Sequence, residues 1–105
     1  MWLAPYLAAA GAELAVAASL PDAPKRLAAA AVMAEQNSWA AACLARATAR
    51  LTGDHDTYAQ ALERWTRIGA RIDHAETLLL LPDRAEEGRA ELALCAEPAA
   101  SILPT

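Results

Sequence analysis

Apolar residues recur along most of this chain at intervals of three and four residues, the spacing that places side chains on one face of an α-helix. Short segments containing Gly, Pro, Asp or Asn interrupt the pattern, and these residues are typical of helix ends and starts. The pattern therefore predicts an all-α fold of about six helices, packed as antiparallel hairpins in a short right-handed array. The predicted helices cover residues 3–20, 24–35, 39–51, 56–68, 71–81 and 83–95.

The same spacing predicts which side chains face the core. About thirty residues are alanine and none is phenylalanine, so the helices should pack closely around small side chains. The expected core positions, in chain order, are Leu3, Leu7, Ala10, Leu14 and Ala17; Leu27, Ala30, Ala31 and Ala34; Ala40, Cys43, Leu44, Ala47 and Leu51; Tyr58, Ala61, Leu62 and Trp65; Ile72, Ala75, Leu78 and Leu79; Ala85, Gly88, Leu92 and Cys95 or Ala96.

The segment Gln36-Asn37-Ser38 allows two interpretations. It contains no Pro or Gly, so one helix could continue from residue 24 to residue 51. However, Asn tolerates the left-handed conformation at a helix end, and Ser is a good N-terminal cap. These preferences favour a tight turn between two helices.

Aspartates are the expected caps of three other helices. Asp22 precedes Pro24 at one start, and Asp54 lies in the clear turn after Gly53. Asp83 is followed three residues later by Glu86, which resembles a capping box. The helical pattern predicts a single domain over residues 1–96. Prolines at positions 98 and 104 predict a loose tail over residues 97–105.

The first twenty residues are mostly apolar, which raises three alternatives. A signal peptide is disfavoured because no Lys or Arg precedes the apolar run. A membrane-spanning helix is disfavoured because Glu13 would lie in hydrocarbon and the run is rich in alanine rather than leucine. We therefore expect a packed helix, in a cytoplasmic protein that does not associate with a membrane.

Net charge is −4 and is unevenly distributed. Residues 1–52 carry four basic and three acidic side chains, whereas residues 53–105 carry five basic and ten acidic ones. Binding to nucleic acid requires clustered Lys and Arg, so we expect no nucleic-acid partner for this chain itself. Arg46 and Arg50, one helical turn apart, are expected to be solvated surface.

Few residues point to a chemistry. Cys43 and Cys95 lack CxxC spacing and are expected to be buried, reduced thiols. His55 follows Asp54 in what we interpret as a polar helix cap. The carboxylates of residues 73 and 76, and those of residues 87 and 91, have helical spacing, but nearby arginines favour solvated faces. We therefore predict no catalytic residue, no cofactor and no metal ligand.

The three tryptophans, Trp2, Trp39 and Trp65, are expected to fill gaps between helices.

A rough repeat with a spacing of 33 residues relates two parts of the chain. The related positions are Trp39, Ala42 and Ala45 in one part and Ile72, Ala75 and Leu78 in the other. A period near 34 residues with two helices per unit is the tetratricopeptide pattern. Residues 39–69 resemble one such unit with its turn at Gly53, although the following unit is shorter.

Residues 58–94, YAQALERWTRIGARIDHAETLLLLPDRAEEGRAELAL, resemble a more particular family. The segment is similar to the helical-repeat regions of large bacterial ATP-binding transcriptional regulators of the LuxR type and of related ATPase–cyclase signalling proteins. That resemblance implies a scaffold or sensor segment between an ATPase and a DNA-binding helix-turn-helix. The chain has no GxxxxGK[ST] loop, so it resembles a fragment of such a region.

These observations predict a non-enzymatic protein–protein interaction or scaffold module, part of or derived from a bacterial signalling or transcription regulator. Its expected partner is another protein or a second copy of the chain, as in a homodimer, because the first helix carries few charges. The alternative is a small helical enzyme or ligand-binding bundle with a site near Asp73, His74 and Glu76.

Overall fold

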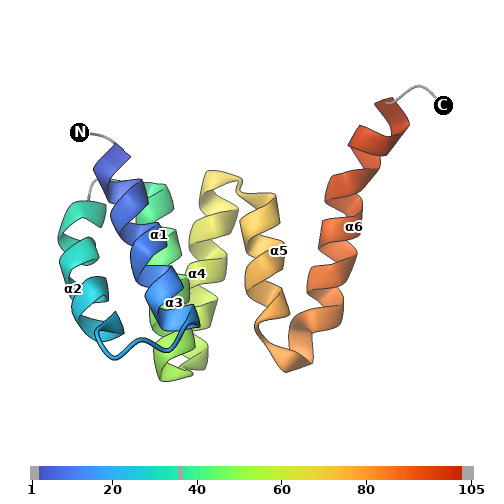
Figure 1. Cartoon of the computed structure of the whole chain (residues 1–105). Coiled ribbons are helices and arrows are strands. Elements are labelled where there is room, and N and C mark those ends of the chain that lie inside the picture. Colours follow the sequence, from blue (N-terminus) through green and yellow to red (C-terminus); the bar gives the residue numbers. More distant parts are fainter. Residues whose placement is uncertain (1–2, 36, 103–105) are drawn as a thin grey trace.

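The computed structural model describes residues 3–35 and 37–102, with side chains for residues 4–35 and 37–96. This part of the chain is all-α and contains no β-strand. In Figure 1 the second helix lies outermost on the left, the first and third helices lie between it and the fourth, and the fifth and sixth follow to the right. Their bounds are α1 Leu3–Ala17, α2 Ala23–Ala34, α3 Ser38–Thr52, α4 His55–Ile68, α5 Arg71–Leu79 and α6 Ala85–Ile102, with a single 3₁₀ turn, η1, at Pro82–Arg84.

Consecutive helices form three hairpins, in which α1 packs on α2, α3 on α4, and α5 on α6. Neighbouring hairpins touch where α1 and α2 meet α3 and where α4 meets α5. The expected all-α array of stacked helical hairpins is therefore confirmed. The alanine-rich faces permit this arrangement, because small side chains let neighbouring helix backbones approach.

Two glycines end helices as the sequence predicts. Gly53 follows α3 with φ +71°, and Gly69 follows α4 with φ +75°. Both lie in the left-handed region, which side chains other than glycine rarely adopt. The backbone N–H of Gly53 donates to the carbonyl oxygen of Ala49, so the last turn of α3 is closed by this residue.

Asn37 separates α2 from α3, so the chain has two helices here rather than one. The Oδ1 atom of Asn37 accepts a hydrogen bond of 2.8 Å from the N–H of Ala40, and its backbone is extended. The N-terminal cap is therefore Asn37 and not Ser38, which is the first residue of α3. The expected left-handed conformation of Asn37 is also wrong. Gln36 lies outside the described residues.

Of the other three expected caps, only Asp54 is confirmed. Its side chain accepts hydrogen bonds from the N–H of Asp56 and from the hydroxyl of Thr57. Asp22 makes no capping bond and instead pairs with Arg26 at 2.8 Å.

The expected capping box at Asp83 is wrong as well. The residue lies inside η1, whose first turn has no side-chain cap. Glu86 pairs with Arg89 instead of reaching back towards the start of the helix. The 3₁₀ turn after Pro82 takes the place of the expected first turn of the helix.

The predicted inward face of α1 is wrong. Leu7 and Leu14 are 71% and 70% exposed, and Ala17 is exposed too. The buried residues of α1 are Ala9, Ala12 and Ala15. Close packing of α1 against both α2 and α3 explains the reversal, because an alanine face brings two neighbouring helices nearer than a leucine face can.

Elsewhere the predicted core is mostly confirmed. All four positions expected on α4 are buried, and Trp65 is completely so. Tight packing at α5 and α6 requires Gly88, because a Cβ atom there would lie 2.8 Å from the carbonyl oxygen of Ala75. The expected core residues that are exposed are Ala31, Leu51, Ile72, Leu79 and Ala96.

The last helix is longer than predicted. It continues through Pro98 to Ile102 instead of ending near Cys95. The division into a packed domain to residue 96 and a loose tail after it stays a prediction. No helix in the described ranges combines the length and apolar character needed to cross a membrane.

Candidate functional site

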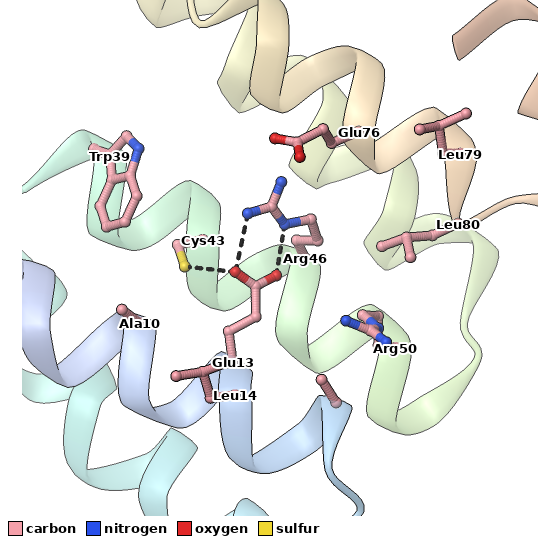
Figure 2. A pocket seen from close by; sticks show the side chains of 11 residues that line it. Ala10, Glu13, Leu14, Trp39, Cys43, Arg46, Arg50, Glu76, Leu79 and Leu80 are labelled. Atoms are coloured by element: carbon pink, nitrogen blue, oxygen red, sulfur yellow. Dashed lines mark hydrogen bonds and ion pairs between the residues drawn. The ribbon is translucent and has the colours of Figure 1, made fainter. Parts of the chain in front are cut away.

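A cavity of about 610 Å³ lies between α1, α3 and α5, the first helices of the three hairpins (Figure 2). Its volume lies within the range typical of ligand-binding clefts. Its lining residues are Ala10, Glu13, Leu14 and Ala17 on α1, Trp39, Cys43, Arg46 and Arg50 on α3, and Glu76, Leu79 and Leu80 on α5 and the residue after it.

The lining residues of α3 follow one face of that helix. They are spaced by four, three and four residues, which is the helical repeat. At 1.5 Å per residue, the distance from Trp39 to Arg50 along the axis is about 16 Å. The cavity is therefore an elongated groove that follows three turns of α3.

Glu13 and Arg46 form a two-point ion pair in this groove (Figure 2). The Nε atom of Arg46 donates to Oε2 of Glu13 at 2.6 Å, and Nη2 donates to Oε1 at 2.9 Å. The Sγ atom of Cys43 also donates to Oε1, at 3.1 Å. The Arg46 and Glu13 side chains are 11% and 17% exposed, so the pair neutralises two largely buried charges.

Arg46 also contacts α5. Its Nη1 atom donates to the carbonyl oxygen of Asp73 at 3.3 Å and to the hydroxyl of Thr77 at 3.4 Å. The same atom lies 3.6 Å from the Asp73 carboxylate. One side chain on α3 therefore joins the first and third hairpins, although α3 and α5 are not adjacent in the array.

Aromatic rings pack beside the ion pair. The Arg46 guanidinium carbon lies 5.0 Å from the ring centroid of Trp65, a cation–π distance. Trp39 lies between Trp65 and Tyr6, with ring centroids 6.2 Å and 5.2 Å away. The expected role of Trp65 and Trp39 as fillers between helices is confirmed, whereas Trp2 lies outside the described residues.

Burial and the ion pair set the protonation states here. Burial, and then the hydrogen bond to Glu13, raises the pKa of the Cys43 thiol to about 12. Burial lowers the pKa of Arg46, but the hydrogen bond and charge of Glu13 outweigh it, so this pKa is raised overall. Near neutral pH the site therefore holds a protonated thiol and a permanent guanidinium ion, and the thiol is a poor nucleophile.

The alternative site near residues 73–76 is divided by the structure. Asp73 faces Arg46, whereas the Nδ1 atom of His74 lies 2.7 Å from Oε1 of Glu91 on α6. Glu76 lines the groove. Asp73 and His74 thus contact different partners, Glu76 lines the groove, and the three side chains do not share a common centre.

The remaining candidates lie outside the groove. His55 is exposed beside the confirmed cap of α4, and Glu87 forms an exposed pair with Arg84. Cys43 is buried as expected and Cys95 is half-buried, and both are free thiols. Within residues 3–35 and 37–102 no three His, Cys, Asp or Glu side chains cluster closely enough to hold a metal ion.

Sequence reasoning missed the central pair of the site. Arg46 was expected to be solvated, and this expectation is wrong, whereas Arg50 is exposed. The sequence pattern predicted for Glu13 only that its charge disfavours a membrane-spanning helix. One signal was available, because a single acid in an otherwise uncharged helix needs a buried partner if that side of the helix faces the core.

Comparisons with known proteins do not place the chain in a family. No family model, curated protein or solved structure gives a significant match. The resemblance to regulator repeat regions therefore stays a prediction.

Proposed function

We propose that this chain is a non-enzymatic protein–protein interaction module that holds a segment of another protein in the groove between α1, α3 and α5. The observation that carries the proposal is the position of the groove, which is lined by the first helix of every hairpin. Stacked helical hairpins commonly use such extended surfaces for binding.

The chemistry of the lining supports binding over catalysis. The acid Glu13 and the base Arg46 are bonded to each other, and the Cys43 thiol is kept protonated. General acid–base catalysis needs a group that can exchange a proton near the working pH. Apolar side chains, including Leu14 and Trp39, provide much of the remaining wall.

The biological setting that we propose rests on the resemblance of residues 58–94. The module would be part of, or derived from, a cytoplasmic bacterial signalling or transcription regulator, in which it would relay a signal by holding a partner. A groove in an array of helical hairpins is suited to holding a partner segment.

A random 16-residue peptide library displayed on phage, selected against the immobilised chain, tests this proposal. We expect enriched peptides to bind the wild type and to lose most of their affinity for Ala10→Trp, which fills the groove from α1. Gln60→Trp is the matched control, because Gln60 is an exposed residue of α4 outside the groove. Circular dichroism should show that both variants keep the helical fold.

Two results would overturn the proposal. One is the absence of any enriched peptide, and the other is equal binding of the enriched peptides to Ala10→Trp and to Gln60→Trp. Light scattering on the free chain identifies a different occupant, because a dimer that Ala10→Trp abolishes would mean that a second copy fills the groove.

A further inference from the structure

We infer that the segment held in the groove is an amphipathic helix that brings an acidic side chain to Arg50 and a basic side chain to Glu76. This inference rests on the proposed function and specifies the chemistry of the partner.

Four charged side chains line the groove, and they differ in their partners. Glu13 and Arg46 are paired with each other. Arg50 and Glu76 are exposed and take part in no ion pair or side-chain hydrogen bond within the described chain. A partner therefore meets one positive and one negative charge that no other described side chain neutralises.

These two charges lie at different places in the groove. In Figure 2, Glu76 and Arg50 are on opposite sides of Arg46, with Leu80 on the side of Arg50 and Leu14 beside Glu13. Opposite charges at separate positions favour one orientation of a partner and disfavour its reverse, in which like charges would meet. The groove thus selects a segment with a fixed order of acid and base.

The walls favour a helix over an extended strand. They are formed by helices, whose interior backbone N–H and C=O groups are already hydrogen-bonded to one another. An extended segment would enter this groove with backbone groups that find few partners, which is costly on burial. A helix satisfies its own backbone and presents apolar side chains at intervals of three and four residues.

The length of the groove sets the size of the contact. Trp39 and Arg50 are about 16 Å apart along α3, so a partner helix of three to four turns would contact its whole length. Leu14 and Leu79, exposed in the free chain, are placed to contact its apolar stripe. Both line the same groove, and exposed apolar side chains that are gathered at one site mark an interaction surface.

The test uses peptides selected on the wild type and measures their affinity for two charge-reversed variants. Arg50→Glu changes the charge in the groove, and Arg67→Glu makes the same change on the outer face of α4, where Arg67 pairs with exposed Glu63. We expect Arg50→Glu to weaken binding about tenfold and Arg67→Glu to change it little. Thermal unfolding confirms that both variants fold.

Exchange of charge on the peptide completes the test. Replacing the peptide acid by Lys should restore binding to Arg50→Glu, and a new selection on that variant should enrich basic residues at the same position. Replacing the peptide base should weaken binding to the wild type but not to Glu76→Gln. The peptides should also gain helical circular dichroism when bound.

The possible results distinguish a failure of the charged-helix inference from a failure of the proposed binding groove. Peptides that are blocked by Ala10→Trp but bind Arg50→Glu and Arg67→Glu equally would refute the charged helix while the groove remains a binding site. Proline-rich peptides that stay extended when bound would refute it too. Peptides that bind Ala10→Trp as tightly as the wild type would refute both.

Discussion

The carboxylate of Glu13 on α1 and the guanidinium of Arg46 on α3 are joined by two hydrogen bonds of 2.6 Å and 2.9 Å. Arg46 also donates to the backbone of Asp73 on α5. Since these helices belong to three different hairpins, this one pair links the whole array. The stability of the fold should therefore depend on it more than on any surface ion pair.

Replacing Glu13 by Ala should lower the free energy of unfolding by about 3 kcal/mol, because the largely buried charge of Arg46 then keeps only its longer contact with the Asp73 carboxylate. Glu63→Ala is the control. It breaks an ion pair whose side chains are both 69% exposed, and it should cost less than about 1 kcal/mol. Urea denaturation of both variants measures the difference, and equal losses would contradict the central role of the pair.

Removing both charges at once should be milder than removing one. In Glu13→Leu/Arg46→Met both members of the buried pair are removed together, and apolar side chains of similar length replace them. Only the more exposed Asp73 carboxylate loses its contact with Arg46. We expect the double variant to be more stable than Glu13→Ala in the same urea experiment. A double variant less stable than the single one would mean that the hydrogen bonds of Arg46 to α5 dominate.

Two helical glycines should respond to alanine in opposite ways. A Cβ atom at Gly88 would lie 2.8 Å from the carbonyl oxygen of Ala75 and 3.1 Å from Cβ of Leu78, so Gly88→Ala should force α6 away from α5 and destabilise the chain. Nothing lies within 4 Å of a Cβ atom at Gly11. Gly11→Ala should therefore stabilise α1 by up to about 1 kcal/mol. The two melting temperatures should shift in opposite directions.

Two residues before helices should differ as caps. Asn37→Ala removes the hydrogen bond to the N–H of Ala40 and should cost about 1 kcal/mol. Asp22→Ala removes only an exposed pair with Arg26 and should cost less than about 0.5 kcal/mol. Chemical denaturation of the two variants under one condition tests this order, which is the reverse of a ranking based on charge.

The two cysteines should differ in reactivity. At pH 8 a thiol reagent should modify Cys95 in the folded chain, whereas Cys43 should react only after unfolding, because it is 1% exposed and its pKa is raised to about 12. Mass spectrometry after labelling distinguishes the two sites. Rapid modification of Cys43 in the native state would show that the groove opens far more than its packing implies.

The raised pKa of Cys43 also predicts a pH dependence of stability. The folded thiol holds its proton more tightly than the unfolded thiol, whose pKa is near 9.0. The contribution of the Cys43 proton to the free energy of unfolding is therefore complete below pH 9. It is lost progressively as the pH rises from about 9 towards 12. Cys43→Ala should show a shallower decline than the wild type over this range, and parallel curves would contradict the assignment.

Helix positions were predictable because each depends on neighbouring residues. Gly53 and Gly69 mark helix ends through a backbone conformation that follows from their own chemistry. The face of α1 was not predictable in this way. Leucines are usually buried, but here the packing of α1 against two helices at once makes the alanine face the better core.

The site itself depends on contacts between distant residues. Glu13 and Arg46 are 33 positions apart, and no local pattern links them. The helix caps were only partly predictable from the sequence. Asn37, Asp22 and Asp83 all have suitable side chains, but only the backbone geometry around each decides whether the oxygen faces a free N–H group.

The unequal lengths of the last two helices have a mechanical consequence. Helix α5 has 9 residues and α6 has 18, and α6 leans away from α5 in Figure 1. At Gly88 the backbone of α6 packs closely against α5, and Ile102 lies about 21 Å further along the helix axis. With that contact as a pivot, a tilt of about 10° would move the end of α6 by about 4 Å. A small rotation of α6 about its contact with α5 would therefore produce a larger displacement of Ile102.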